Sequence, residues 1–489
     1  MKLYEEQYRP QYHFTPSEKW MNDPNGMVYY EGEYHLFYQY HPGSTVWGPM
    51  HWGHVISEDL VSWKQMPIAL KPDEHGTIFS GSAVVDLNDT TGFFDRGHGL
   101  VAIFTHHDEC PDMKRVVQTQ SLAYSKDKGR TWEKYEGNPV LSNENYPDFR
   151  DPKVFWHEES KKWIMTLACG KSLHFYASAN LKDWEFMSEF KKEMSHQGVW
   201  ECPDLFQLPV EGTGELKWVL ILSLGIDPNW EEGSRTQYFI GEFDGKTFVN
   251  DNSEETVLWL DYGRDNYAGV TWSDMPEEDN RRIYIAWMNN WCYANVVPTE
   301  NWRGAMTLPR ELTLISTEEG VRIKQQPIKE IEKLREKHHE WKNVVIEPDK
   351  TFEKHLETDS VEILVSLEVD NESEFYLNLA EEGNEHYTRI GYNGEKNSVF
   401  VDRSHSGEHD FSPAFPGKDE VQLESRSHTL NLRIFVDIST VEVLVNEGEK
   451  SLTYLVFPKD KINKVAFSYH GGETKIHSFE IYDLKGIWN

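Results

Sequence analysis

Three acidic residues in distant parts of the chain share one local pattern. Asp23 in "MNDPNG", Asp151 in "FRDPKVFW" and Glu201 in "WECPDLFQL" each stand beside a proline at the mouth of a predicted strand. Proline removes a backbone donor and fixes φ, so strand pairing is predicted to stop where the acid projects. A lone Asp-Pro usually marks a turn, whereas three acids in the same slot indicate side chains that meet in one site.

Carboxylates that meet in an aromatic-lined site suit cleavage of a glycosidic bond, because one acid protonates the leaving oxygen while the other attacks or directs water. The sequence neighbours suggest the roles. Trp200 and the apolar run after it are predicted to desolvate Glu201 and keep it protonated as the general acid. Arg150 is predicted to keep Asp151 ionised, and Asp23, supplied with amide donors by its turn, is the candidate nucleophile.

A repeated unit of strand, polar turn and aromatic strand predicts how these acids are brought together. The unit recurs around Trp63, Trp132 and Trp184 and, more loosely, around Phe248, and "RRIYIAWMNNW" adds material for a fifth copy. Irregular spacing of a constant unit is typical of propeller blades with loops of different length. Inner strands of a propeller start near its axis, so the acids would converge on a central funnel. The alternative is a generic all-β sandwich in which such turns recur by chance.

The chain of 489 residues is longer than one hydrophobic core usually serves, which predicts two domains. In "QQPIKEIEKLREKHHEW", Ile328, Ile331 and Leu334 fall on one helical face and predict a linker helix. Beyond it, alternating segments predict an antiparallel sandwich. We therefore expect an all-β protein with a five-bladed β-propeller catalytic domain over 1–325, a helical linker over 326–340 and a β-sandwich over 341–489.

Charge and hydropathy limit the classes of binding partner and predict the cellular compartment. The chain carries 82 acidic and 49 basic residues, a formal charge of −33 that repels nucleic acid and anionic membranes, so neither is an expected partner. The N-terminal stretch has no signal-peptide pattern and the longest apolar run, "WVLILSLGI", is too short to span a bilayer. The chain as written is expected to be cytoplasmic, and secreted if a signal peptide has been removed. No oligomeric state is predicted.

Cysteines and histidines predict no metal site and no cofactor. The four cysteines lack C-x-x-C spacing, which argues against zinc and against a disulfide framework. His51 and His54 lie three apart on a predicted strand, so their side chains point to opposite faces. Cys202 is interpreted as packing against or tuning the neighbouring acid rather than as a thiol nucleophile, because no histidine base stands at motif spacing.

Several motifs together resemble a known family. "WMNDPNG", "FYQYHP", "WGPMHWGH", "IFSGS", "FRDP" and "WECPDLF" occur in this order and closely resemble glycoside hydrolase family 32, the β-fructosidases that include invertases, inulinases and levanases. The resemblance continues through "LDYGRDNYAG", "WMNNW", "LPREL" and "VDISTVEVLVNEG". It implies a five-bladed propeller with a sandwich, and retaining hydrolysis of terminal non-reducing β-D-fructofuranosyl units. Retention predicts catalytic carboxyls about 5 to 5.5 Å apart.

The same resemblance implies residue roles. Asp23 matches the nucleophile, Glu201 the acid/base, and Asp151 the acid that holds fructose hydroxyls in the transition state. The residues that match the fructose subsite are Asn22, Gln39, Trp47, Phe79, Ser80, Arg150 and Trp287.

The substrate within the family is predicted from finer similarity. "VWGPMHWGH" looks like levanase and exo-inulinase members, whereas sucrose-6-phosphate hydrolases more often carry a basic residue where Pro49 and Met50 stand. We therefore expect an exo-acting fructan β-fructosidase that also cleaves sucrose, with sucrose-6-phosphate hydrolase as the alternative. Short imported fructo-oligosaccharides would reconcile a fructan substrate with the absence of a signal peptide.

Two further alternatives remain at this stage. A non-catalytic fructan-binding module would need hydrogen bonds and stacking but no matched acid and nucleophile, so the three carboxylates favour an enzyme. A transferase, which passes fructose to another sugar instead of water, would use the same catalytic residues and would lengthen oligosaccharides at high sucrose.

The assigned roles predict the effect of removing either acid. Asp23→Ala and Glu201→Ala should each lower turnover of sucrose by several orders of magnitude while the fold stays intact, because nucleophilic and acid catalysis carry that weight. Steady-state rates with circular dichroism as the fold control measure this. Near wild-type rates in either variant would contradict the assignment.

Overall fold

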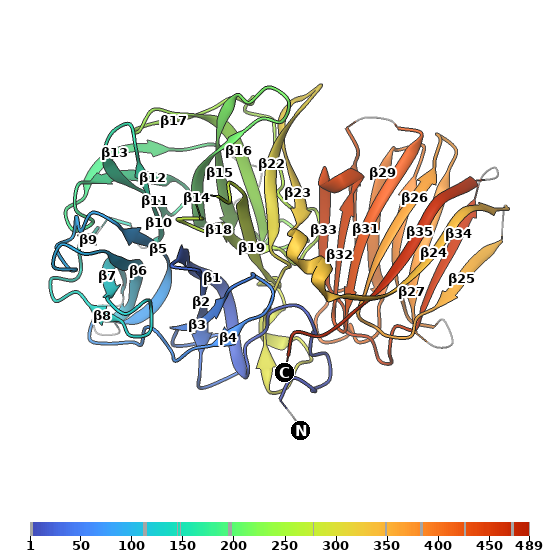
Figure 1. The fold of residues 1–489 in the computed structure, drawn as a ribbon, viewed down its shortest axis with the longest axis horizontal. Coiled ribbons are helices and arrows are strands. Elements are labelled where there is room, and N and C mark those ends of the chain that lie inside the picture. Colours follow the sequence, from blue (N-terminus) through green and yellow to red (C-terminus); the bar gives the residue numbers. More distant parts are fainter. Residues whose placement is uncertain are drawn as a thin grey trace.

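The computed structural model describes residues 3–488 apart from 111–114, 144, 147, 194–197, 277, 348–349, 382–384, 425–426 and 471–473. Strands dominate it, and they form two bodies that lie side by side, five small sheets in one and two larger sheets in the other (Figure 1). The predicted propeller and the predicted sandwich are both confirmed. Among the described residues, no helix is long and apolar enough to cross a membrane.

The propeller is built from five consecutive sheets, which we number as blades 1 to 5. Blade 1 contains β1 (Lys19–Tyr30), β2 (Glu33–His41), β3 (His51–Ser57), β4 (Lys64–Gln65) and β20 (Trp302–Arg303). Blade 2 contains β5 (Thr77–Asp86), β6 (Gly99–Cys110), β7 (Arg115–Ser125), β8 (Glu133–Lys134) and β9 (Leu141–Ser142). Blade 3 contains β10 (Phe149–His157), β11 (Lys162–Cys169), β12 (Leu173–Ser178) and β13 (Glu185–Phe190). Blade 4 contains β14 (Trp200–Pro209), β15 (Leu216–Leu224), β16 (Arg235–Phe243) and β17 (Phe248–Asn250). Blade 5 contains β18 (Tyr267–Thr271), β19 (Arg282–Met288), β21 (Ala305–Met306), β22 (Arg310–Thr317) and β23 (Gly320–Pro327), and a short 3-10 helix, η2 (Ala294–Val296), follows β19.

The first strand of every blade carries a bulge at an equivalent place. The pairing of β1, β5, β10, β14 and β18 with the next strand shifts between Met21 and Pro24, Ile78 and Gly81, Arg150 and Lys153, Glu201 and Asp204, and Tyr267 and Val270. A bulge adds one unpaired residue and re-aims its side chain. The three acids therefore lie inside strands at bulges. The expectation that pairing stops at the prolines is wrong, because it resumes directly beyond each bulge.

The aromatic repeat corresponds to the turn between the third and fourth strands of blades 1 to 4. The turn carries Asp59, Asp127, Asn180 and Asp244 in successive blades, and each side-chain Oδ1 accepts backbone N–H groups two to four residues further on. Such local acceptance is what Asp and Asn contribute to turns. The indole of Trp184 then donates to the carbonyl of Leu181 at 2.8 Å, which folds the aromatic back over the turn.

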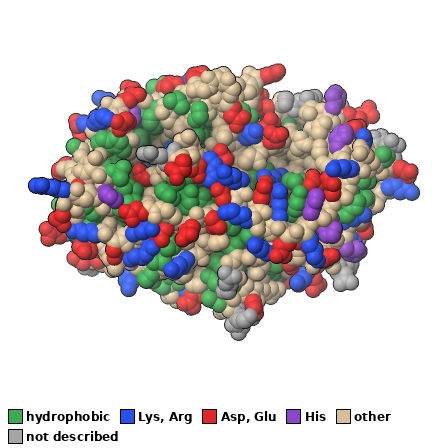
Figure 2. Space-filling model, viewed as in Figure 1, with side chains coloured by type: hydrophobic (Ala, Val, Ile, Leu, Met, Phe, Trp, Pro, Cys, Tyr) green, Lys and Arg blue, Asp and Glu red, His purple; other side chains and the backbone are tan. Residues whose placement is uncertain are grey.

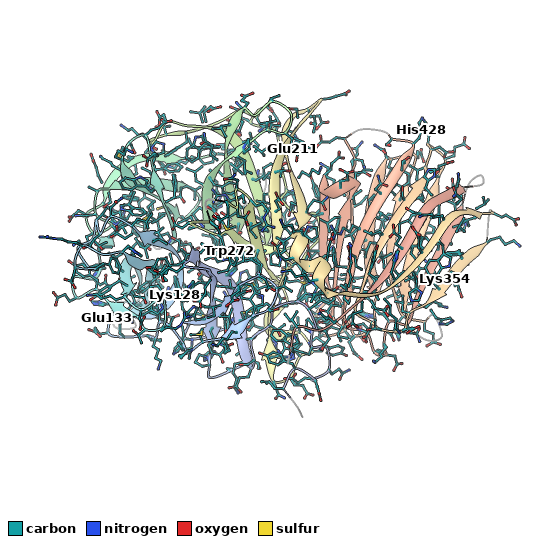
Figure 3. The ribbon with its side chains drawn as sticks, in the orientation of Figure 1. Lys128, Glu133, Glu211, Trp272, Lys354 and His428 are labelled. Carbon is teal, nitrogen blue, oxygen red and sulfur yellow. The ribbon has the colours of Figure 1, made fainter. Side chains whose placement is uncertain are left out.

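Contacts between the last and first blades close the ring. β20 leaves blade 5 and pairs in parallel with β1. Trp272, near the centre of Figure 3, donates its indole N–H to the carbonyl of His35 in blade 1 at 3.0 Å. On the other side of blade 1, Glu33 accepts from Arg130 of blade 2 at 2.8 Å. Together these contacts hold blade 1 from both sides.

The predicted linker helix is shorter than expected. Only Lys329–Leu334 is helical, as the 3-10 helix η3, and strand β24 (Arg335–Ile346) begins at the next residue, inside the segment predicted as helix. Ile328, Ile331 and Leu334 are buried as expected. Their spacing of three residues matches the three-residue turn of a 3-10 helix, which explains why the apolar face appeared in the sequence although no α-helix forms.

The sandwich consists of two six-stranded sheets. The first contains β24, β26 (Val361–Glu368), β31 (Thr429–Asp437), β32 (Thr440–Val445), β33 (Lys450–Leu455) and β35 (Thr474–Leu484). The second contains β25 (Thr351–His355), β27 (Glu374–Ala380), β28 (Tyr387–Asn393), β29 (Ser398–His405), β30 (Lys418–Gln422) and β34 (Lys464–His470). A 3-10 helix, η4 (Asn446–Gly448), joins β32 to β33. Alternate residues of both sheets, such as Val443 and Phe467, form one buried core.

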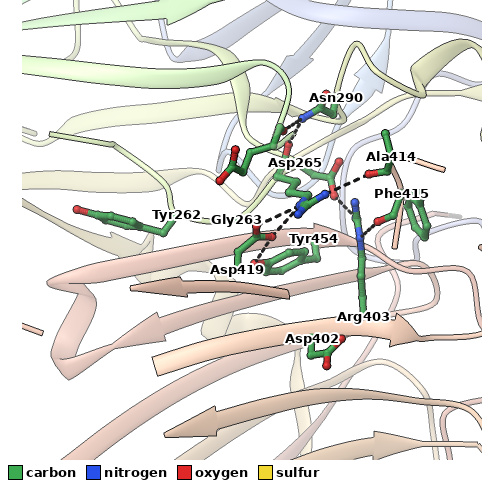
Figure 4. Close-up of polar contacts among 12 residues, drawn as sticks. Tyr262, Gly263, Asp265, Asn290, Asp402, Arg403, Ala414, Phe415, Asp419 and Tyr454 are labelled. Atoms are coloured by element: carbon green, nitrogen blue, oxygen red, sulfur yellow. Dashed lines mark hydrogen bonds and ion pairs between the residues drawn. The ribbon is translucent and has the colours of Figure 1, made fainter. Parts of the chain in front are cut away.

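Buried ion pairs join the propeller to the sandwich. Arg403 of β29 contacts Asp265 and Tyr293 of the propeller. Arg264 of the propeller contacts Asp419 of β30 at 3.0 Å. Figure 4 shows Arg403, Asp265 and Asp419 at this interface. Charges taken out of water need partners in good geometry, so such pairs fix one relative orientation of the surfaces that carry them. Away from this interface, acidic and basic side chains are interspersed over the face that Figure 2 shows.

The N-terminal segment is fastened to the same interface. The carboxylate of Asp437 accepts the backbone N–H groups of Gln11, Tyr12 and His13 at 2.8 to 3.3 Å. The imidazole of His13 lies between two acids of the sandwich, with Nδ1 2.9 Å from Asp437 and Nε2 2.9 Å from Glu442. Burial lowers the pKa of His13, but the two carboxylates outweigh it and raise that pKa to about 9.

This histidine should make stability depend on pH. The folded pKa of about 9 exceeds the ordinary value of 6.5, so the stabilisation is fully present below pH 6.5 and is lost as pH rises through 9. The difference corresponds to roughly 3 kcal/mol. We expect His13→Gln to lower the thermal midpoint at pH 6 and to flatten its decline toward pH 9. His355→Gln, on an exposed strand, is the matched control. Equal slopes in wild type and His13→Gln would contradict this account.

Candidate active site

A cavity of about 360 Å³ opens at the axis of the propeller, at the bulged ends of the inner strands. All three predicted acids line it. The full lining comprises Asn22, Asp23, Gln39, Trp47, Phe79, Ser80, His107, Glu109, Val116, Gln118, Asp148, Arg150, Asp151, Glu201 and Trp291. These side chains come from every blade, so the cavity exists only in the closed ring.

Asp23 is held by side chains from three blades. Its Oδ1 accepts the amide of Asn22 at 2.9 Å, and its Oδ2 accepts the hydroxyl of Ser80 at 2.6 Å and the thiol of Cys202 at 3.5 Å. The side-chain amide of Asn22 is a donor from the same stretch, as expected, whereas Ser80 and Cys202 come from other blades. Burial raises the pKa of Asp23, the Ser80 bond lowers it, and the charge of Glu201 raises it further.

Cys202 joins Asp23 to Asp151. Its backbone N–H donates to Oδ2 of Asp151 at 3.0 Å, and its Sγ lies 3.6 Å from the same oxygen. Asp151 and Cys202 have φ of 64° and 47°, so two bulges place two residues in the left-handed region at the axis. Burial and the neighbouring acids raise the pKa of the Cys202 thiol well above its ordinary value. The sulfur is therefore a neutral donor, which agrees with its interpretation as a residue that packs against the acids.

Glu201 accepts hydrogen bonds from two residues that fix its orientation. Arg150 donates to Oε1 from Nη2 at 3.0 Å and from Nε at 3.3 Å, and the hydroxyl of Tyr267 donates to Oε2. Trp200, which was expected to desolvate Glu201, instead points into the core between blades 3 and 4. Neighbouring residues of a strand face opposite sides, so the indole and the carboxylate are separated by the backbone.

The charge of Arg150 lowers the pKa of Asp151, in the direction that the sequence predicted. The guanidinium turns toward Glu201 and Asp148. Asp151 is buried, and that burial raises its pKa to about 7; the charge of Arg150 lowers the value, and the charges of Glu201 and Asp23 raise it. Burial therefore outweighs the charge of Arg150, so the pKa of Asp151 lies above its ordinary value, whereas the sequence had predicted this acid to stay ionised.

Among the residues predicted for the fructose subsite, Asn22, Gln39, Trp47, Phe79, Ser80 and Arg150 line the cavity. Trp287 does not, because it is fully buried behind the lining, with its ring 4.8 Å from that of Trp291 and 6.0 Å from that of Trp20. Trp291 lines the cavity in its place. Both belong to "WMNNW", and the strand ends at Met288, so the later tryptophan reaches the axis from a loop.

Sequence reasoning missed one wall of the site. His107, Glu109, Val116 and Gln118 come from the long β6–β7 hairpin, and Asp148 precedes β10. Their alternation within two ordinary strands carried no signal of a site. Tyr267 stands in the quoted motif "LDYGRDNYAG", where the equivalence of the fifth bulge to the other four could have identified it.

Aromatic rings form one side of the cavity. Phe79 stacks on His107 with ring centroids 4.1 Å apart, and Trp47 meets the edge of Phe79 at 6.1 Å. Trp47 is 39% exposed, which leaves part of its ring for a ligand. Rings of this kind pack against the C–H faces of sugars, while the carboxylates opposite accept hydroxyl groups.

No cluster of three or more potential metal ligands occurs in the part of the chain that the structure describes. His54 contacts His35 at 3.1 Å and is buried, while His51 contacts the carbonyl of Pro49. The two histidines thus have separate surroundings, as expected for positions three apart on a strand.

Three carboxylates in a polar, aromatic-walled cavity at the axis of a five-bladed propeller define an enzyme that cleaves glycosidic bonds. Residues 13–327 match the Glycosyl hydrolases family 32 N-terminal domain, and residues 330–483 match the Glycosyl hydrolases family 32 C terminal. The chain belongs to glycosyl hydrolase family 32 and is a glycoside hydrolase.

Similar proteins include a levanase from Bacillus subtilis (strain 168), which is 50% identical over 99% of this chain and 72% of its own length. The exo-inulinase from Aspergillus awamori has a similar crystal structure, with a TM-score of 0.89, 36% identity, and coverage of 99% of this chain and 100% of that one. A fructofuranosidase from Schwanniomyces occidentalis, solved in complex with fructosylnystose, gives a TM-score of 0.89 at 32% identity and covers 99% of both chains.

The contacts of Cys202 predict a modest and directional effect of its removal. Cys202→Ala takes a hydrogen bond from Asp23, so the pKa of Asp23 rises and the acidic limb of kcat/KM moves to higher pH. Loss of one such bond is worth about 1 kcal/mol, or about tenfold in rate at most.

Cys202→Ser keeps a donor at this place and should move the acidic limb less. Cys169→Ala is the matched control, because it removes a buried thiol in blade 3 that does not line the cavity. A complete loss of activity in Cys202→Ala with an intact fold would identify the thiol as a nucleophile and overturn this interpretation.

Proposed function

We propose that the cavity binds the terminal, non-reducing β-D-fructofuranosyl unit of fructans, short fructo-oligosaccharides and sucrose, and releases fructose by a retaining mechanism. The observation that carries this proposal is the meeting of Asp23, Asp151 and Glu201, each from a different blade, in one cavity beside an aromatic wall. The similarity to a levanase, an exo-inulinase and a fructofuranosidase supports the choice of sugar.

Asp23 is the nucleophile in this proposal. It attacks the anomeric carbon and forms a covalent fructosyl-enzyme, while Glu201 gives a proton to the departing oxygen. Water then enters on the side of the departed sugar, Glu201 removes its proton, and the hydroxide releases fructose with the original configuration. Three donors already orient Asp23, so little reorganisation is needed for attack.

Asp151 positions the fructosyl unit. Because burial and neighbouring charges raise its pKa to about 7, it can donate as well as accept a hydrogen bond near neutral pH. A carboxyl in either protonation state can accept a hydrogen bond from a sugar hydroxyl, and the protonated form can also donate one. A permanently charged carboxylate could only accept. Arg150 bridges Glu201 and Asp148 and keeps the acid/base on the same side of the cavity.

The charges around the cavity favour a neutral substrate over a sugar phosphate. Five carboxylates line it, those of Asp23, Glu109, Asp148, Asp151 and Glu201. Among the described lining residues, Arg150 is the single lysine or arginine. Its guanidinium already contacts two of these acids. A phosphate dianion would meet this negative field without a free partner, which opposes binding of sucrose 6-phosphate.

Product analysis tests the proposal. The pure protein is incubated in parallel with sucrose, inulin, levan, short fructo-oligosaccharides and sucrose 6-phosphate. We expect free fructose from the first four and little from the phosphate. Hydrolysis confined to sucrose 6-phosphate would overturn the substrate proposal, and longer oligosaccharides at high sucrose would identify a transferase. Proton NMR of the first turnovers should show β-fructofuranose, as retention requires.

A further inference from the structure

Trp47, at the exposed end of the aromatic wall, stands on a loop rather than on a strand. The loop covers residues 42–50 and joins β2 to β3. The indole is 39% exposed and meets the edge of Phe79 with ring centroids 6.1 Å apart. A side chain that is packed on one face only keeps a defined place when its backbone is held, so the contacts of this loop decide where the wall ends.

The backbone of Trp47 is held by a side chain from another blade. Its N–H donates to Oδ1 of Asn295 at 2.9 Å. Asn295 lies in η2 of blade 5, 248 positions further along the chain. Asn295 is exposed and lies outside the cavity lining, so its side chain acts on the wall residue and not on a ligand in the cavity.

Arg303 of β20 fastens the same two segments together. Its Nη1 donates to the carbonyls of Thr45 at 2.9 Å and of Asn295, and its Nη2 donates to those of Val297 at 2.9 Å and Thr299 at 3.0 Å. The residue is 8% exposed, and this burial lowers the pKa of its guanidinium. Because a buried cation needs its donors paired, movement of either segment would leave N–H groups of Arg303 without acceptors.

Contacts within blade 1 shape the rest of the loop. Nδ1 of His41 lies 2.9 Å from the carbonyl oxygen of Val46. A Cβ at Gly48 would lie 2.6 Å from the same imidazole, so the loop folds tightly over this ring. These contacts lie on either side of Trp47 in the chain. Asn295 supplies the bond at Trp47 itself, and that bond crosses from blade 5 to blade 1.

We propose that Asn295 is a positioning residue for substrate binding, which places the indole of Trp47 against the sugar at the mouth of the cavity. Arg303 gives the contact its rigidity by holding both partners. The inference rests on the proposed function, because it requires that Trp47 packs against a fructoside. Such packing is made in the bound substrate and in the transition state alike, so Asn295 acts on affinity and hardly on turnover.

The kinetics of Asn295 variants test this role. We expect Asn295→Ala to raise KM for sucrose about three- to tenfold, as the loss of one hydrogen bond predicts, and to keep kcat within about twofold. Asn295→Asp keeps an acceptor at the same place and should restore KM. Asn295 is exposed, so the thermal midpoint of each variant should stay close to that of the wild type.

Asn393→Ala is the matched control. Oδ1 of Asn393 also accepts a backbone N–H at 2.9 Å, that of Lys396, but in the sandwich and outside the cavity lining. This variant should leave KM and kcat unchanged. A fall in kcat at constant KM in Asn295→Ala would contradict the proposed role.

A double-mutant cycle separates positioning of Trp47 from a general effect on the structure. In a Trp47→Ala background, Asn295→Ala should change KM by less than about twofold, because the ring that it positions is gone. Effects that simply multiply would show that Asn295 acts elsewhere and would overturn the inference. Calorimetric titration of sucrose into Glu201→Gln, with and without Asn295→Ala, should show the same loss of affinity without turnover.

Hydrolysis by the wild-type protein distinguishes the two possible failures. A wild-type protein that releases no fructose from sucrose, fructans or fructo-oligosaccharides would overturn the proposed function and this inference with it. A wild-type protein that releases fructose, while Asn295→Ala keeps the wild-type KM, would overturn this inference alone.

Discussion

Five inner strands meet around one axis, and each must present a side chain there while it keeps the pairing that holds its blade together. The bulge that each inner strand carries at the same height resolves this constraint. It takes one residue out of the ladder and turns a side chain toward the axis. The nucleophile candidate, its serine donor, the carboxyl with the raised pKa, the acid/base candidate and its tyrosine partner all stand at these bulges. The site is therefore a property of the ring and not of any single blade.

The bulges also explain how much of the site could be predicted from sequence. Asp-Pro and Glu-Cys-Pro show where a strand departs from regular pairing, so Asp23, Asp151 and Glu201 were visible. Ser80 and Tyr267 occupy the same slot without a proline and gave no such signal on their own. The blades themselves were visible through the turn that repeats Asp or Asn before an aromatic, because that turn depends on local hydrogen bonds.

Electrostatic roles could not be predicted from neighbours along the chain. Trp200 was expected to desolvate Glu201, and Arg150 was expected to keep Asp151 ionised. Alternation along a strand instead sends Trp200 into a core, and the bulge turns Arg150 toward Glu201. Burial, which the neighbours along the chain do not reveal, raises the pKa of Asp151 to about 7. The short linker shows the same limit. Apolar residues three apart predict one face of an α-helix, but the same spacing fits the 3-10 helix that the structure contains. What depends on contacts between blades becomes visible only once the ring is closed.

The capture of Gln11, Tyr12 and His13 by Asp437 has a consequence for the order in which the chain acquires its structure. The contact between Gln11 and Asp437 joins residues 426 positions apart. A segment made first during synthesis therefore waits for β31 and β32, which are made near the end, before its backbone amides are paired. Blade 1 can form its own hairpins early, but the segment that precedes β1 is anchored last. The N-terminal segment of the propeller thus reaches its final contacts only when the sandwich has folded. The second domain therefore contributes to folding of the first, whether or not it contacts substrate.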